Sequence, residues 1–265
     1  MTLESTHGPP PGYLSWREGE IDVVALEPLA RGVREALEEG SLYEYAAHHP
    51  DAVPLAGRGI AYAVPLPGGL ADGVVRRSRH GGLLAPVTGE RFVGDTRAPI
   101  ELENALRLTR LGVPTPEVLA YATYPAGPML RRADVVTRLV PGSRDLAERL
   151  SDDGGVEDAT ALMRAVALLI ARMAGACARH PDLNLKNVLI TEDDDGHFDA
   201  MLLDVDRVWF DREGASRATA ANLRRFARSA RKWRRLRGLP VEEAHLLALE
   251  AEVAALAGVP GATAS

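Results

Sequence analysis

The first half of the chain alternates short apolar runs with glycine and proline, which is the pattern of β-strands joined by turns. Four strands are predicted, over residues 60–64, 74–77, 118–122 and 135–139. A helix that begins at Pro99 and ends at Gly112 separates the two pairs, because proline suits the first helical turn and glycine the residue after the last. A shorter helix is expected over 31–39, and residues 1–20 are expected to be loose.

The second half has a helical pattern. Over residues 157–179, apolar positions share one helical face, namely Leu162, Val166, Leu169, Ile170 and Met173. A strand (NVLI), an acidic turn (EDDDG) and a second strand (AMLLD) follow, and residues 218–257 read as helix. The chain is therefore predicted to be an α+β protein with an N-terminal extension over 1–50, a strand-rich lobe over 51–140 and a mainly helical lobe over 141–265.

Composition places the chain among ordinary globular proteins, since 46% of its 265 residues are hydrophobic and 26% are charged. It contains no apolar run long enough to span a membrane and no secretory signal pattern at its start. Cys177 is the single cysteine, so an intrachain disulfide is excluded, which fits a reducing cytoplasm. Because Cys177 lies in an apolar helical run, we expect it to be a small buried hydrophobe.

Charge is distributed unevenly along the chain. The formal net charge is −6, yet the segment from Arg217 to Arg237 has nine basic residues and no acidic one. Such asymmetry favours an anionic partner for this segment.

Candidate chemistry lies in HPDLNLKN (180–187) and LLDVDR (202–207). Asn187 follows Asp182 by five residues in a loop after a helix, and Asp204 ends a strand after a hairpin. Phosphoryl transfer from ATP needs such a set: one carboxylate receives the proton of the attacking hydroxyl, while an amide oxygen and a second carboxylate hold Mg²⁺. The alternative is that Asp182 and Asn187 cap a turn. The acidic turn at 193–195 is interpreted as a solvated hairpin tip.

A second group of candidates lies upstream. Gly57 and Gly59 would let backbone N–H groups approach phosphates. Arg76 ends a predicted strand, and Glu101 lies early in the next helix. A strand cation that contacts the α- and β-phosphates and pairs with a helix carboxylate is a feature of kinase sites. Individually, Arg76 could be solvated and Glu101 a first-turn acid that the helix dipole favours.

Taken together, these stretches resemble the lipopolysaccharide kinase family, the Kdo/heptose kinases, over about residues 57–232. The resemblance rests on GRGIAYAV, VVRRSRHGG, ELENALRLTRLGVPTPEV, DVVTRLVPGSRDLAERL, HPDLNLKN, LLDVDR and NLRRFARSARKW. It implies the two-lobed protein-kinase-like fold, ATP and Mg²⁺ as cofactors, and transfer of the γ-phosphate to a hydroxyl of 3-deoxy-D-manno-octulosonic acid (Kdo) on lipid A.

By position, the resemblance makes Asp182 the catalytic base, Asn187 and Asp204 the Mg²⁺ ligands, and Arg76 the phosphate-contacting cation paired with Glu101. Several positions depart from the protein-kinase pattern: Arg76 stands where those enzymes have lysine, Asn184 replaces the loop lysine, and Val205 replaces an aromatic residue. Lys186 either contacts the γ-phosphate or is exposed.

The resemblance also implies a cytoplasmic enzyme, peripheral on the inner membrane, because its acceptor is an anionic glycolipid. Arg224, Arg228 and Arg231 are then candidates for docking to the acceptor or an anionic membrane surface. They surround a predicted apolar stripe of Leu223, Phe226, Ala230, Trp233 and Leu236. Alternatively, they solvate a structural helix.

Three other functions remain open from the residues alone. One is phosphotransfer to an aminoglycoside or a free sugar, which uses a similar loop. Another is a kinase-shaped binding module without activity, against which the intact Asp182, Asn187 and Asp204 argue. Nucleic-acid binding is disfavoured, because aromatic residues make up only 5% of the chain and the net charge is negative.

Overall fold

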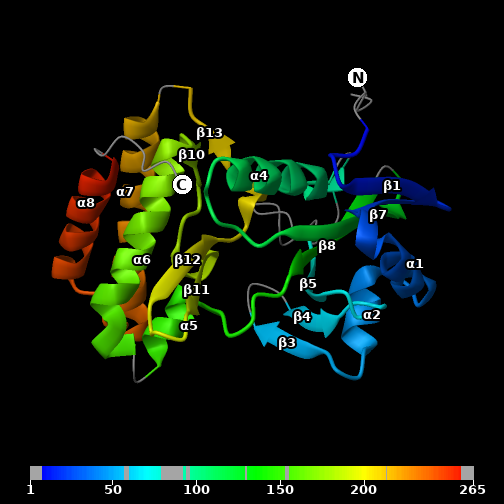
Figure 1. Cartoon of the computed structure of the whole chain (residues 1–265), viewed down its shortest axis with the longest axis horizontal. Coiled ribbons are helices and arrows are strands. Elements are labelled where there is room, and N and C mark those ends of the chain that lie inside the picture. Colours follow the sequence, from blue (N-terminus) through cyan, green and yellow to red (C-terminus); the bar gives the residue numbers. More distant parts are fainter. Residues whose placement is uncertain are drawn as a thin grey trace. The chain divides into compact units, whose positions relative to one another are not determined.

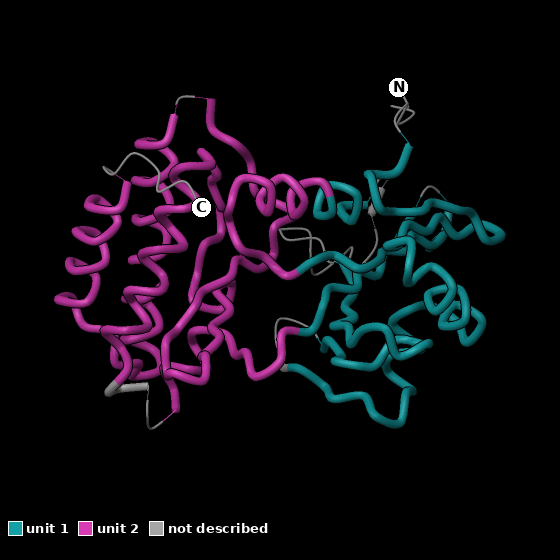
Figure 2. Tube along the Cα trace, in the orientation of Figure 1, with its two compact units in different colours: residues 1–102, 117–139 teal, residues 103–116, 140–265 magenta. Residues whose placement is uncertain are grey.

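The computed structural model describes residues 8–56, 60–78, 92–93, 96–128, 130–152, 155–212 and 214–257. The chain forms two compact units, residues 1–102 with 117–139 and residues 103–116 with 140–265 (Figure 2). The predicted α+β class is confirmed, with a strand-rich first unit and a mainly helical second unit. The first unit ends at Leu139, next to the expected boundary, but residues 103–116 group with the second unit.

The first unit is built on an eight-stranded antiparallel sheet of order β1-β2-β7-β8-β5-β4-β3, in which β6 also pairs with β8 (Figure 1). Its strands are β1 (Tyr13–Glu18), β2 (Ile21–Leu26), β3 (Val53–Ala56), β4 (Ile60–Pro65), β5 (Asp72–Arg77), β6 (Phe92–Val93), β7 (Val118–Gly127) and β8 (Leu130–Arg138). The four predicted strands correspond to β4, β5, β7 and β8, with longer bounds for β7 and β8.

Residues 13–18 and 21–26, near the N-terminus, belong to this sheet, although residues 1–20 were expected to be loose. The hairpin β1–β2 pairs with β7, and the helices η1 (Glu27–Leu29), α1 (Ala30–Glu38) and α2 (Leu42–His48) follow it. Val33 of α1 and Leu42 of α2 are buried in one apolar core with Val75, Leu119 and Val136 of the sheet. The two helices and one face of the sheet thus form the core of this unit.

The second unit is mainly helical and also holds a small sheet of order β12-β11-β9 and the pair β10–β13 (Figure 1). Its elements are β9 (Arg144–Asp145), α5 (Leu146–Ser151), α6 (Gly155–Gly175), β10 (Ala178–Arg179), η2 (Leu185–Asn187), β11 (Val188–Glu192), β12 (Phe198–Leu202), η3 (Val205–Arg207), β13 (Trp209–Phe210), α7 (Ala215–Arg237) and α8 (Glu243–Ala257). Helix α4 (Ala98–Arg110) begins in the first unit and ends in the second.

Helix α6 is the centre of the second unit and packs against α5, α7, α8 and β12. The predicted face is buried, with Leu162, Val166, Leu169, Ile170 and Met173 at 0–1% exposure. The helix ends at Gly175, earlier than predicted, because the chain reverses at Cys177, whose φ is +51°. Cys177 is therefore a partly exposed turn residue rather than a buried helical one.

The predicted C-terminal helix is two helices. Gly238, at φ +68°, ends α7, and its N–H donates to the carbonyl of Arg234. Pro240 follows, and α8 begins at Glu243. The predicted apolar stripe of α7 is buried at Phe226 and Ala230, half-buried at Leu223 and Trp233, and exposed at Leu236. Among the described residues, no helix combines the length and apolar character that crossing a bilayer requires.

Candidate active site

The HPDLNLKN loop follows β10, and helix α7 holds the backbone at its start through one amide side chain. Asn222 is fully buried. Its Oδ1 accepts from the N–H of His180 at 3.0 Å, and its Nδ2 donates to the carbonyl of Ala178 at 2.9 Å. Since an asparagine inside an apolar core is costly unless both polar atoms are paired, these bonds fix where the loop leaves β10.

His180 joins the loop to the LLDVDR segment. Its Nδ1 accepts from the N–H of Asp182 at 3.1 Å, and its Nε2 lies 3.1 Å from the carbonyl oxygen of Asp204. Because Nδ1 accepts, the ring proton is on Nε2 and is donated to that carbonyl. Burial lowers the pKa of His180, against the opposing effect of Asp204 and Asp182, which favours the neutral ring. The His180 ring thus connects the backbone of Asp182 with the backbone of Asp204.

Two asparagines shape the loop around Asp182. Nδ2 of Asn184 and Nδ2 of Asn187 both donate to the carbonyl oxygen of Asp182, at 2.8 and 2.9 Å. Oδ1 of Asn184 accepts from the N–H of Lys186 at 2.9 Å. Because the nitrogen of the Asn187 amide donates to Asp182, its oxygen is the atom that can act as a cation ligand.

Asp204 lies at the same end of the β11–β12 hairpin as Asn187. The N–H of Leu203 donates to the carbonyl of Asn187 at 2.9 Å, directly before Asp204. Asp204 has left-handed backbone angles, φ +59° and ψ +48°. Such a conformation is unfavourable for a residue other than glycine and is frequent at functional sites. Its carboxylate and the amide oxygen of Asn187 are hard oxygen donors, which suits Mg²⁺.

Asn104 of α4 supports the backbone after Asp204. Its Nδ2 donates to the carbonyl oxygens of Val205 and Val208, at 2.8 and 2.9 Å. The residues are about 100 positions apart in the sequence, so spacing arguments do not find this contact. A buried asparagine in an amphipathic helix is the one local signal, because a polar group at a core position needs a partner.

Lys186 is held by an acidic residue of the second unit. Its Nζ lies 3.1 Å from Oδ2 of Asp145, and 6.0 Å from the centre of the Trp233 ring. The side chain is 34% exposed, so Lys186 is neither fully buried nor freely solvated. Asp145 caps α5 through its other oxygen, which accepts from the N–H of Glu148.

Arg76 and Glu101 form an ion pair within the first unit. The guanidinium of Arg76, at the end of β5, donates to Oε1 of Glu101 in the first turn of α4. Glu101 is 3% exposed, so loss of the Arg76 guanidinium would leave a buried carboxylate without this cation, which is energetically costly. Gly57 and Gly59, the predicted phosphate-binding glycines, lie outside the described residues.

A model of the lipopolysaccharide kinase (Kdo/WaaP) family matches residues 58–247, which is well over half of the chain and includes both motifs. The protein belongs to this family.

Curated relatives agree with the family assignment. The 3-deoxy-D-manno-octulosonic acid kinase of Xanthomonas oryzae pv. oryzae is 34% identical over 182 residues, covering 67% of this chain and 68% of the relative. The enzyme of the same name from Stenotrophomonas maltophilia is 32% identical over 211 residues, covering 76% and 79%. A member of this lipopolysaccharide kinase family is a phosphotransferase, as the loop chemistry predicted.

A solved structure extends the agreement to the fold. The structure described as WaaP in complex with acyl carrier protein matches with a TM-score of 0.50 and 20% identity, over 88% of this chain and 98% of that one. The likeness supports the kinase-like fold that the sequence resemblance implied.

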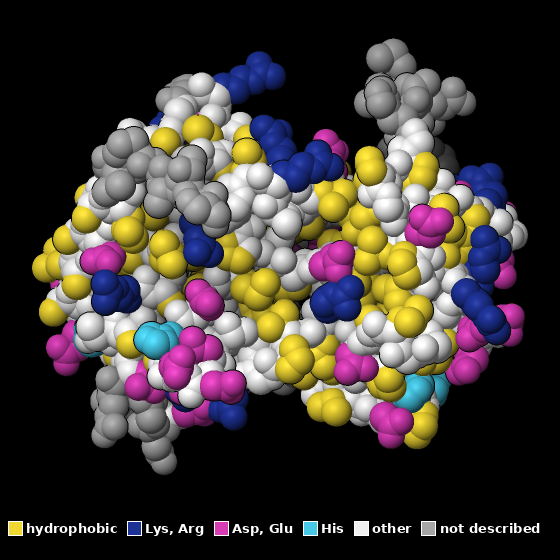
Figure 3. All heavy atoms as spheres, in the orientation of Figure 1, with side chains coloured by type: hydrophobic (Ala, Val, Ile, Leu, Met, Phe, Trp, Pro, Cys, Tyr) yellow, Lys and Arg dark blue, Asp and Glu magenta, His cyan; other side chains and the backbone are white. Residues whose placement is uncertain are grey.

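The three arginines expected to dock a lipopolysaccharide acceptor differ in their contacts. Arg224 and Arg228 are exposed and have no hydrogen bond or ion pair among the described residues. Arg231, in contrast, donates to both carboxylate oxygens of Glu243 in α8. On the face drawn in Figure 3, basic and acidic side chains of the described residues are interspersed. Arg224 and Arg228 are therefore better docking candidates than Arg231.

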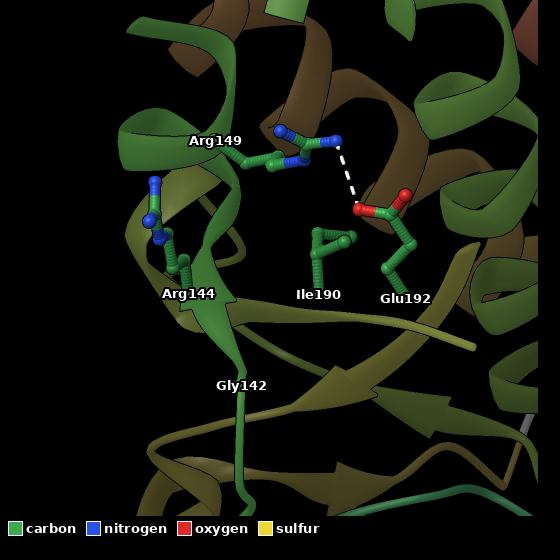
Figure 4. A pocket seen from close by; sticks show the side chains of 5 residues that line it. All are labelled: Gly142, Arg144, Arg149, Ile190 and Glu192. Atoms are coloured by element: carbon green, nitrogen blue, oxygen red, sulfur yellow. Dashed lines mark hydrogen bonds and ion pairs between the residues drawn. The ribbon is translucent and has the colours of Figure 1, made fainter. Parts of the chain in front are cut away.

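Two other charged clusters lie in the second unit. A pocket of about 140 Å³ is lined by Gly142, Arg144, Arg149, Ile190 and Glu192 (Figure 4). Arg149 pairs there with Glu192 at 3.0 Å, and Arg144 pairs with Asp152. At the hairpin tip, Asp193 accepts from the N–H groups of Asp195 and His197, as a solvated turn requires. The cavity arginines are thus paired within the protein, whereas at the exposed hairpin tip the ligand atoms of Asp193, Asp195 and His197 lie within 4.8 Å of one another.

Proposed function

We propose that this protein transfers the γ-phosphate of ATP to a hydroxyl of a Kdo residue attached to lipid A. The observation that carries the proposal is the His180 bridge, because one neutral imidazole links the backbone of Asp182 with that of Asp204. The His180 ring thereby keeps the residue proposed as proton acceptor, Asp182, near the residue proposed as metal ligand, Asp204. The Kdo acceptor rests on the names and extent of the curated relatives.

Asp182 is the proton acceptor in this proposal. The acceptor oxygen attacks the γ-phosphorus, and a new P–O bond forms as the bond to the bridging β–γ oxygen breaks. The electron pair of the broken bond leaves with ADP, and the hydroxyl proton passes to the Asp182 carboxylate. The hydrogen bonds of Asn184 and Asn187 to its carbonyl hold the backbone of Asp182 in place.

Asn187 and Asp204 would hold Mg²⁺. Both supply hard oxygen atoms, and the Asn187 amide uses its nitrogen, not its oxygen, to hold Asp182. When bound, the ion neutralises charge on the β- and γ-phosphates. The left-handed backbone of Asp204 sets the direction in which its side chain leaves the chain. Asn104 stabilises this segment by donating to the carbonyl oxygen of Val205, the next residue.

Further contacts to ATP are assigned to Arg76, Lys186 and two glycines. Arg76, fixed by Glu101, is assigned to the α- and β-phosphates, and Gly57 and Gly59 to backbone contacts with phosphate. Lys186 would contact the γ-phosphate by exchanging its ion pair with Asp145 for a phosphate oxygen. That ion pair is partly exposed, so exchange costs little.

We further propose that Arg224 and Arg228 dock the enzyme on anionic glycolipid at the cytoplasmic face of the inner membrane. Both lie one turn apart on α7 and are exposed. Each cation near an anionic surface contributes about 1 kcal/mol. Replacing both by Gln should raise KM for lipid-linked acceptor several-fold at low salt and leave turnover at saturation unchanged. Equal KM values for this variant and the wild type contradict docking, and Arg231→Gln, which breaks an intramolecular pair, is the matched control.

An acceptor panel tests the function. Purified protein with ATP and Mg²⁺ is given Kdo-lipid A, free Kdo or an aminoglycoside, and the product is identified by the mass of one added phosphate. The proposal predicts transfer to Kdo-lipid A with the highest kcat/KM. Preferential transfer to the aminoglycoside would overturn the acceptor assignment while leaving the kinase family untouched.

A further inference from the structure

Arg225 of α7 contacts the proposed catalytic base, although 43 positions separate the two residues. One terminal nitrogen of its guanidinium donates to Oδ1 of Asp182. Its Nε donates to the carbonyl oxygen of Pro181 at 3.2 Å. A single planar group therefore holds both the carboxylate of Asp182 and the peptide just before it, which fixes the rotamer as well as the backbone.

The pair is better shielded than a surface salt bridge. The side chains of Asp182 and Arg225 are 16% and 32% exposed. Charges that are partly removed from water interact more strongly, and a charge-assisted hydrogen bond of a guanidinium has fixed geometry. The contact is therefore suited to restrict the motion of the carboxylate.

The side chains of Asn184 and Lys186 have partners other than the carboxylate of Asp182. Asn184, two positions after Asp182, uses its side chain within the loop, on Asp182 and on Lys186. Lys186 pairs with Asp145. Arg225 therefore brings a positive charge to Asp182 from a helix that is distant in sequence. Within the loop, Asn184, two residues after Asp182, has a neutral amide side chain.

Helix α7 presents this contact together with a second one. Asn222 and Arg225 are three residues apart and so lie on the same side of the helix. Asn222 holds the backbone of His180, and Arg225 holds Pro181 and Asp182. Arg224 and Arg228 are exposed instead, so Arg225 differs from its basic neighbours in the direction that it faces.

We propose that Arg225 is a positioning residue for phosphoryl transfer, holding the Asp182 carboxylate toward the acceptor hydroxyl and placing a positive charge beside it. This inference rests on the proposed function. Misplacement of a reacting group by about 1 Å can lower the rate about 100-fold. The role of Arg225 is therefore expected in kcat rather than in KM for ATP.

The test compares Arg225→Gln, Arg225→Lys and Arg225→Ala with the wild type on Kdo-lipid A. Arg225→Gln should lower kcat by about 100-fold and change KM for ATP by less than about threefold. Arg225→Lys should recover part of the loss, because an ammonium keeps the charge but cannot make both contacts. Added guanidinium ion should raise the turnover of Arg225→Ala. Arg237→Gln, an exposed change at the end of the same helix, is the control for general effects of lost charge.

Two results would overturn the inference. One is wild-type kcat in folded Arg225→Gln. The other is a loss that follows the folded fraction, measured by thermal unfolding, with no response of Arg225→Ala to guanidinium, since that pattern belongs to a purely structural ion pair. Asp182→Asn in the same assay separates the inference from the proposed function. If Asp182→Asn is inactive and Arg225→Gln is fully active, only the role of Arg225 fails; if Asp182→Asn is active, the assignment of the base fails.

Discussion

Asp134 of β8 is a buried carboxylate whose ionisation should make the first unit less stable as pH rises. Its side chain is 1% exposed, and its Oδ2 accepts from the N–H of Tyr43 at the start of α2, at 3.0 Å. Burial raises the pKa of Asp134 from 3.8 to about 6, although the Tyr43 N–H, Arg132 and Arg77 oppose the shift. Desolvation therefore outweighs the favourable contacts.

The sign and size of the effect follow from linkage. A carboxyl group with a raised pKa in the folded state binds its proton more tightly there than in the unfolded chain. Stability is therefore greatest below pH 3.8 and declines until pH exceeds about 6. At about 1.4 kcal/mol per pH unit, the total loss is about 3 kcal/mol, of which about 2 kcal/mol falls between pH 4 and pH 7.

Asp134→Asn removes the ionisation and keeps an oxygen that can accept from Tyr43. Urea unfolding at several pH values between 4 and 7 should show the variant gaining stability relative to the wild type by about 2 kcal/mol over this range. Asp51→Asn removes an exposed carboxylate of the same unit and serves as the control. Parallel curves for Asp134→Asn and the wild type would refute the reasoning, because the pH dependence would then come from other groups.

Two further predictions concern ATP binding. Asp204→Ala should weaken Mg·ATP binding by at least about tenfold in calorimetric titration and Asn187→Ala by less, because a carboxylate holds Mg²⁺ better than an amide; unchanged affinity in Asp204→Ala would remove it as a ligand. Arg76→Ala should raise KM for ATP and also lower the melting temperature, since it leaves the buried Glu101 carboxylate without this cation. Arg76→Ala with Glu101→Ala should be no worse than Arg76→Ala alone, whereas fully additive losses would show that the pair does not act as a unit.

The parts of the site that are close in sequence could be predicted. Asp182 and Asn187 lie in one loop, and the strand–turn–strand pattern before Asp204 places it after a hairpin, as the structure has it. Their types and spacing predict oxygen ligands and a proton acceptor. What the sequence motif could not give is the imidazole bridge of His180, because its partners are backbone atoms of two different loops.

Long-range supports could not be predicted. Asn222, Arg225 and Asn104 reach the site from helices whose packing depends on the whole second unit. In sequence, Arg225 is one of many arginines in α7. It differs from its exposed neighbours only in the side of the helix on which it lies, and that side is known only once the helix is packed. A hydrophobic pattern predicts which face is buried, but not which polar residue at its border meets a carboxylate.

The errors in predicted elements have equally local causes. Residues 1–20 are expected to be loose because they are rich in proline and glycine, yet residues 13–18 (YLSWRE) form β1, which pairs with β2 along its whole length. The C-terminal helix was expected to continue past Gly238, where a left-handed glycine ends α7. In the first case the pairing with β2 outweighs the local composition, and in the second the glycine cap ends the helix.

Asp182→Asn gives the most direct test of the central claim, that the loop around Asp182 performs phosphoryl transfer. On one preparation, phosphate transfer to Kdo-lipid A and Mg·ATP affinity are both measured, beside the wild type. The account predicts that transfer falls by about 1,000-fold or more while the Kd for Mg·ATP stays within about threefold, because the variant loses the proton acceptor and keeps the ligands. Turnover near that of the wild type would contradict it.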